Sequence, residues 1–208
     1  MTEHEPEVVR LARPSRGHFD LGTGHHGDLW LDLDALFLRP ARVRPHARWL
    51  AGRLAAHRPD AVCGPLAGGA FLAQAVADAL GAAFLPAYPG PAAGPGGPGE
   101  PRGPGGPIGF RLAPTVRSQV RGWRVTIVDD AINAGTATRA CFRELRGAGA
   151  VPVAVAALLS LGAAEDMVAA TTALPFYAVA SMPSQVWPAG NCQLCAGGVP
   201  LTFPSSGE

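Results

Sequence analysis

The segment over residues 125–140 constrains the fold of this chain most, because it joins a short apolar run to two acids and a loop of small residues. Residues 125–128 are all β-branched and bounded by turn formers, which indicates a buried parallel strand. Asp129 and Asp130 follow at the carboxyl end of this strand. Ligands of open α/β sheets bind outside the carboxyl ends of the strands, and paired carboxylates there can accept hydrogen bonds from sugar hydroxyls. The segment therefore predicts an α/β fold with a site for a sugar.

The loop after the two acids has little side-chain bulk. It consists of Asn133, Ala134, Gly135, Thr136 and Ala137. Its backbone N–H groups can close around an anion at the N-terminus of a helix that begins near Thr136. The loop thus predicts a phosphate cradle, although the same residues, taken alone, also fit an ordinary turn between a strand and a helix.

The rest of the chain alternates between strand and helix patterns. The expected strands lie at residues 61–64, 83–88, 125–128, 152–161 and 176–181, and the expected helices at 39–57, 71–80 and 136–147. Such alternation predicts a parallel sheet covered on both faces by helices. A chain of 208 residues with 48% hydrophobic content suits a single domain over residues 1–208.

A second ligand loop is predicted between the expected strand at residues 61–64 and the following helix. It contains Leu66, Ala67, Gly68 and Gly69. Glycines let backbone N–H groups approach an anion closely, and the following helix adds a favourable field. A tight turn without a ligand is the alternative for this loop.

Charge and hydropathy exclude several classes of protein. The net charge of +1 argues against a nucleic-acid surface, and no apolar run is long enough for a membrane span, so we expect a cytoplasmic protein. All 17 basic residues are arginine. The chain therefore has no lysine for Schiff-base chemistry or for binding a pyrophosphate.

The four cysteines do not indicate a disulfide scaffold in a chain of this length. Cys63 and Cys141 fall in apolar segments and are expected in the core. Cys192 and Cys195 form a C-x-x-C pair, for which zinc binding and redox chemistry both stay open. No second pair of ligands is evident nearby, so the sequence predicts no metal held by protein side chains.

The run VDDAINAGTA at residues 128–137 resembles the signature of the type I phosphoribosyltransferases, which bind 5-phosphoribosyl-1-pyrophosphate (PRPP). Its Ala-Gly-Thr-Ala portion is similar to that of some orotate phosphoribosyltransferases, although Asn133 and Ala134 stand where threonine is commoner. The tail at residues 187–206 resembles the tail of one bacterial and archaeal branch of these enzymes, in which Cys-Pro-Leu-Cys precedes Gly-x-Pro.

The resemblance implies a type I phosphoribosyltransferase-like sheet with a small hood built from the N- and C-terminal segments. It implies that Asp129 and Asp130 hold the ribose, that residues 133–137 hold the 5-phosphate, and that residues 66–69 hold the pyrophosphate. A non-proline cis peptide is expected at Leu66–Ala67 or its neighbour. The resemblance also implies Mg²⁺ bound mainly through PRPP, a homodimer, and a flexible Gly/Pro-rich lid at residues 89–109 that brings Arg102 to the reaction. A disordered surface insertion is the alternative for this segment.

The base is less well defined than the sugar site. Residues 23–28 resemble a Ser-Gly-Arg-His-Ser-Asp element that contacts the pyrimidine, which implies base contacts by Gly24, His26 and Asp28. Gly162 stands where the family has an arginine that pairs with the orotate carboxylate. The resemblance implies transfer of phosphoribosyl from PRPP to orotate, giving orotidine 5-monophosphate and pyrophosphate. A transferase for another base and a degenerate, PRPP-sensing homologue are the alternatives.

Overall fold

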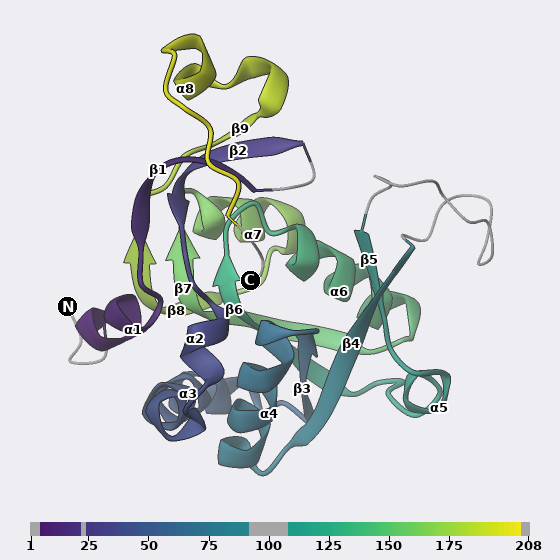
Figure 1. Ribbon diagram of the computed structural model, residues 1–208. Helices are drawn as coiled ribbons and strands as arrows, with labels where there is room; N and C mark the ends of the chain where they lie inside the picture. The colour runs from purple at the N-terminus through teal and green to yellow at the C-terminus, as the bar shows by residue number, and fades with distance from the viewer. Residues whose placement is uncertain (1–4, 22–23, 92–107, 205–208) are drawn as a thin grey trace.

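The computed structural model describes residues 5–21, 24–91 and 108–204 (Figure 1). Its elements are, in order, α1 (Glu5–Leu11), β1 (Ser15–Asp20), β2 (His25–Trp30), α2 (Asp34–Phe37), α3 (Pro40–Leu54), η1 (Ala55–His57), β3 (Ala61–Pro65), α4 (Gly68–Leu80), β4 (Ala83–Pro91), β5 (Ile108–Arg111), α5 (Pro114–Arg117), β6 (Arg124–Ile132), α6 (Thr136–Gly147), β7 (Val151–Leu161), α7 (Ala164–Thr172), β8 (Phe176–Met182), β9 (Val186–Pro188), η2 (Ala189–Asn191) and α8 (Gln193–Ala196).

The central sheet has the strand order β5-β4-β3-β6-β7-β8. Strands β4, β3, β6, β7 and β8 run parallel to their neighbours, and only the edge strand β5 is antiparallel to β4. The central strands β3, β6 and β7 are buried on both faces, as continuous apolar runs such as residues 153–159 require. The α/β prediction is confirmed.

Alternate side chains of the strands pack into two hydrophobic cores on opposite faces of the sheet. Val62 and Val128 join the core beneath α1, α3 and α4, whereas Cys63 and Ile127 join the core beneath α6 and α7. Cys141 is buried in the second core as well, so the prediction that Cys63 and Cys141 are core residues is confirmed. In the described ranges, every helix is too short or too polar to traverse a lipid bilayer.

A second, smaller sheet forms the hood that the resemblance implied. It has the order β1-β2-β9 and is antiparallel, so it combines the N-terminal hairpin with a strand from near the C-terminus. Figure 1 shows this hood at the end of the molecule toward which the arrowheads of β6, β7 and β8 point. The hood therefore lies over the carboxyl ends of these strands, where the site is expected.

The direction in which strands are added to the sheet reverses between β3 and β6. The chain passes from β3 to β4 on one side and then returns to place β6 on the other side of β3. Crevices at such a reversal are the usual ligand sites of open α/β sheets. The loops that follow β3 and β6 are the two loops in which the sequence predicts anion binding.

The two ends of the segment predicted as a lid at residues 89–109 form strands. Pro89 pairs with Phe110 and Pro91 with Ile108, so β4 and β5 form the antiparallel arms of a hairpin. Proline is tolerated there because β4 pairs with β3 only as far as Ala87, so beyond that residue β4 has a partner on one side only. Residues 92–107, and with them Arg102, lie outside the described residues.

Candidate functional site

The sequence predicted Asp129 and Asp130 just after the strand, but both lie within β6. Pairing with β7 continues from Arg124 to the Ile132–Ser160 pair, so the strand is longer than its β-branched run. Both acids are more than nine-tenths buried, with relative exposures of 7% and 9%. Because they are consecutive strand residues, they point to opposite faces of the sheet, and each meets a different residue of the loop after β3.

Burial raises the pKa of both acids. Desolvation raises the pKa of Asp129 well above its ordinary value, and the neighbouring Asp130 charge raises it further. Desolvation also raises the pKa of Asp130. Backbone groups compensate in part, since the N–H of Asp130 donates to Asp129 Oδ1 at 3.0 Å and the N–H of Ala131 donates to Asp130 Oδ1 at 2.8 Å. Carboxylates held in this way can accept hydrogen bonds from ligand hydroxyls.

The loop after β3 packs directly against the two acids. A Cβ atom on Gly68 would overlap the Asp130 carboxylate, and one on Gly69 would overlap Asp129 Oδ1. Glycine is required at both positions because only a residue without Cβ leaves room for these oxygens. The predicted ribose and pyrophosphate sites are therefore neighbours.

The loop contains the cis peptide expected from the resemblance. The Leu66–Ala67 bond is cis, which confirms that expectation. The Leu66 N–H donates to Ala87 O at 2.9 Å and extends the pairing of β3 with β4. Of the four residues predicted to hold pyrophosphate, Ala67, Gly68 and Gly69 stand at the start of α4, where the first-turn amides have no intrahelical acceptor.

The predicted phosphate cradle connects β6 to α6. Asn133 and Ala134 form a bend, and Gly135 has a φ of 66°, a left-handed conformation that favours glycine. Helix α6 begins at Thr136, as the sequence predicted. The loop thus aims the first-turn amides of a three-turn helix at the space beyond β6, which suits an anion.

Sequence reasoning missed a cation beside this cradle. Arg139 Nη2 lies 3.3 Å from Thr136 Oγ1, one helical turn away, so its guanidinium stands next to the predicted phosphate position. The signal was the i, i+3 spacing from Thr136 to Arg139. An arginine at this place supplies positive charge beside the loop in a chain that has no lysine.

The three predicted base contacts lie in or beside β2 of the hood. Gly24 precedes the strand with a φ of 76°. The Asp28 carboxylate accepts a hydrogen bond from Arg16 Nη1 at 3.0 Å and another from the Gln185 N–H at 2.8 Å. His26 is buried and points toward His18 and Cys195. The contacts of Asp28 and His26 connect segments of the hood to one another. Base binding by Gly24, His26 and Asp28 stays a prediction.

Gly162, where the family's carboxylate-binding arginine was expected, follows β7 in a left-handed conformation with a φ of 57°. A Cβ atom at this position would lie 2.5 Å from the Ser184 carbonyl oxygen. Real Cβ atoms do not approach a backbone oxygen so closely, so no larger side chain fits without moving the backbone. An arginine at position 162 therefore does not fit the backbone of this chain.

Comparison with known proteins agrees with this geometry. The phosphoribosyl transferase domain family matches residues 33–187, which is more than half of the chain and includes both loops and both acids. The chain belongs to this family. The resemblance to the type I phosphoribosyltransferases is confirmed, and the protein is a phosphoribosyltransferase, an enzyme of the glycosyl-transfer class.

The relatives with similar sequences are named orotate phosphoribosyltransferase. The orotate phosphoribosyltransferase of Caldanaerobacter subterraneus is 26% identical over 192 residues, which cover 92% of this chain and 90% of the relative. That of Carboxydothermus hydrogenoformans is 28% identical over 194 residues, with 91% and 90% covered.

The similar structures include enzymes named for different bases. The adenine phosphoribosyltransferase of Thermoanaerobacter pseudethanolicus has a TM-score of 0.64 at 18% identity, covering 85% of this chain and 99% of its own. The orotate phosphoribosyltransferase of Mycobacterium tuberculosis has a TM-score of 0.61 at 20% identity, covering 87% and 97%. At these identities the structures establish the fold of this phosphoribosyltransferase and leave its base open.

Proposed function

We propose that this phosphoribosyltransferase transfers the phosphoribosyl group of PRPP to orotate, giving orotidine 5-monophosphate and pyrophosphate. The observation that carries the PRPP half is the contact of Gly68 and Gly69 with the Asp130 and Asp129 carboxylates. This contact places the loop predicted to bind pyrophosphate next to two buried acids. Both lie where the strand order of the sheet reverses, between β3 and β6. The name shared by the sequence relatives supports orotate as the base.

In this proposal each part of PRPP meets a different part of the crevice. Ribose hydroxyls donate to Asp129 and Asp130, first-turn amides of α6 bind the 5-phosphate, and amides at residues 67–69 bind the pyrophosphate. A nitrogen of the base forms a bond to the anomeric carbon as the bond to the pyrophosphate oxygen breaks. Positive charge that develops on the ribose is stabilised by the two carboxylates, and charge on the departing pyrophosphate by the loop amides.

The side chains present also fit Mg²⁺ carried mainly by PRPP. Mg²⁺ prefers oxygen ligands, and the Asp129 and Asp130 carboxylates offer oxygens beside the proposed ribose position. When bound, the ion lowers the charge on the leaving pyrophosphate. Arg102, in the predicted lid, and Arg139, beside the cradle, are the cations we propose to act with it.

A second base is favoured by one specific observation. The backbone at Gly162 leaves no room for the arginine that would pair with the orotate carboxylate. A bidentate arginine contact is stronger than a neutral hydrogen bond, so its loss weakens selection for a charged base. A phosphoribosyl acceptor without a carboxylate is therefore the second candidate.

Turnover of a base panel separates the candidates. Pyrophosphate release by the full chain would be measured with PRPP and Mg²⁺ and with orotate, uracil or adenine. The proposal expects kcat/KM for orotate to exceed that for the other bases by at least about tenfold. Preference for an uncharged base would favour the second candidate, and PRPP binding without pyrophosphate release for any base would favour a sensing homologue.

We also propose that the protein is a homodimer and acts in the cytoplasm. Sedimentation velocity of the full chain tests the dimer.

A further inference from the structure

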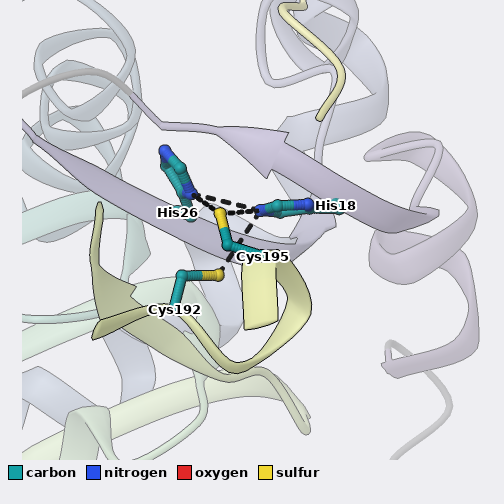
Figure 2. Close-up of side chains that lie close together, drawn as sticks. All are labelled: His18, His26, Cys192 and Cys195. Atoms are coloured by element: carbon teal, nitrogen blue, oxygen red, sulfur yellow. Dashed lines mark hydrogen bonds between the residues drawn. The ribbon is translucent and has the colours of Figure 1, made fainter. Parts of the chain in front are cut away.

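Four potential metal ligands from opposite ends of the chain converge in the hood. They are His18 on β1, His26 on β2, Cys192 at the N-cap of α8 and Cys195 within α8 (Figure 2). One ligand atom from each lies within 4.8 Å of every other. We propose that these four side chains bind one Zn²⁺ ion that fastens the C-terminal segment to the N-terminal hairpin.

The distances match a tetrahedral zinc site. With Zn–N bonds of about 2.0 Å and Zn–S bonds of about 2.3 Å, the edges of a tetrahedron are about 3.3 Å for N···N and about 3.5 Å for N···S. In the structure, His18 Nε2 and His26 Nδ1 are 3.1 Å apart. Cys192 Sγ lies 3.4 Å from His18 Nε2, and Cys195 Sγ lies 3.7 Å from the same atom and 3.3 Å from His26 Nδ1. A metal ion fits among these atoms with small adjustments.

The hydrogen bond of His18 Nδ1 supports a metal ion at the centre of the four side chains. His18 Nδ1 lies 2.8 Å from the carbonyl oxygen of Val199. Because a carbonyl oxygen only accepts, Nδ1 carries the proton and Nε2 presents its lone pair to the cluster. A backbone carbonyl in this role is the usual partner that orients a metal-binding histidine.

Hydrogen bonds among the four side chains do not account for the cluster as well as an ion does. The single lone pair of His18 Nε2 faces three polar neighbours, namely His26 Nδ1 and the two sulfur atoms. If Cys192 donates to His18 Nε2 and Cys195 donates to His26 Nδ1, these two acceptor nitrogens face each other at 3.1 Å with no proton between them. An ion bound by two thiolates and two neutral imidazoles satisfies all four groups, and its site has no net charge.

The backbone and burial are those of a structural site. Cys192 and Cys195 are separated by two residues, the usual spacing of a zinc-binding cysteine pair, and the N–H of Ala196 donates to Cys192 O at 3.1 Å to close the turn between them. His18, His26 and Cys192 are buried, with relative exposures of 2%, 9% and 4%. Four protein ligands leave no open position for a substrate, so the ion is structural.

The hood needs such a connection because it has little core of its own. Its sheet consists of two strands of six residues and one of three. Small units of this kind usually depend on a metal or a disulfide. The C-terminal segment also bonds to β1 directly, through Thr202 N–H to His18 O at 2.7 Å. In this proposal His26 serves as a metal ligand and not as a contact to the base.

The test measures metal and not transferase activity, so its outcome is independent of the proposed function. Zinc in the purified full chain would be quantified by mass spectrometry, and the reduced, metal-free chain would be titrated with Co²⁺. We expect about one zinc per chain, and with Co²⁺ the intense visible bands of a tetrahedral site and a thiolate-to-cobalt charge-transfer band. Chelation should lower the Tm by more than about 5 °C, and Zn²⁺ should restore it.

Matched variants identify the ligands. Cys192→Ser and His26→Gln should reduce zinc binding at least tenfold, whereas Cys141→Ala and His25→Gln should leave it unchanged, since Cys141 lies in the core and the His25 side chain is exposed. The Co²⁺ spectrum of the wild type decides the question if a variant fails to fold. A reduced wild type that binds no Zn²⁺, or a weak octahedral Co²⁺ spectrum, would overturn the proposal.

Discussion

Gly68 lies so close to Asp130 that a Cβ atom at position 68 would overlap the Asp130 carboxylate. The contact joins the first residue of α4, the helix that follows β3, to an acid within β6, the strand paired with β3 in the sheet. It makes the anion loop and the acid pair one unit, in which a change to the loop displaces the acid.

Substituting alanine for Gly68 should therefore impair PRPP binding more than folding. The new methyl group pushes the end of the Asp130 side chain away from the ribose position, and we expect at least about a tenfold rise in the Kd for PRPP, since a charge-assisted hydrogen bond is lost. Gly52→Ala is the matched control, because a Cβ atom there meets open space. Equal PRPP affinity in both variants, measured by calorimetry, would show that the loop and the acid act separately.

Removing the charge of Asp129 should make the fold more stable while it abolishes function. The pKa of Asp129 in the folded protein is raised well above its ordinary value of 3.8, chiefly by burial. Between the unfolded and folded pKa values the folded protein binds more protons, so the wild type loses stability as pH rises through this window. Asp129→Asn does not titrate and should be more stable above it, by on the order of 1 kcal/mol.

Urea unfolding of both proteins from pH 4 upward checks this sign. The difference between the free energies of unfolding should grow with pH and then level off above the folded pKa of Asp129. A wild type that gains stability relative to Asp129→Asn over the same range would mean that the carboxylate is stabilised in the fold and not desolvated.

Arg139 should contribute to PRPP binding through the 5-phosphate. Its guanidinium lies beside Thr136 at the start of α6. Replacement by glutamine removes one charge-assisted contact, which should raise the KM for PRPP by roughly three- to tenfold with little change in kcat. Arg143→Gln, one turn further along α6 and exposed, is the control and should behave as the wild type. A fall in kcat without a change in KM would place Arg139 elsewhere in the mechanism.

Restoring a side chain at Gly162 should destabilise the protein and not improve the use of orotate. Gly162→Ala combines a left-handed φ of 57° with an overlap of its Cβ and the Ser184 carbonyl oxygen. We expect a loss of about 1–3 kcal/mol in the free energy of unfolding, and a similar loss for Gly162→Arg. Gly190→Ala, where a Cβ atom meets nothing, should be nearly neutral. A stable Gly162→Arg with raised kcat/KM for orotate would contradict this account.

Much of the fold was predictable because its signals are local. The apolar strands, the start of α6 at Thr136 and the two glycine loops each follow from a few neighbouring residues. Boundaries were less predictable where pairing decides them. Strand β6 continues through Asp129 and Asp130 because β7 offers partners as far as Ser160, which the residues of β6 alone do not indicate.

The contacts that complete the site depend on strand order, which the sequence did not reveal. Gly68 meets Asp130 only because β3 and β6 are neighbours. His18 and Cys192 are 174 positions apart, and no local pattern joins them. A C-x-x-C pair without nearby partners therefore gave no metal prediction, although the hood places two histidines beside it (Figure 2).

The most direct test of the central claim is pyrophosphate release from PRPP and Mg²⁺ in the presence of orotate, comparing the wild type with Asp129→Asn/Asp130→Asn. The account predicts orotate-dependent release by the wild type, its loss in the double variant by at least about a thousandfold, and a double variant that stays folded. Release that continues in a folded double variant, at a rate close to that of the wild type, would contradict the assignment of Asp129 and Asp130 to the PRPP site.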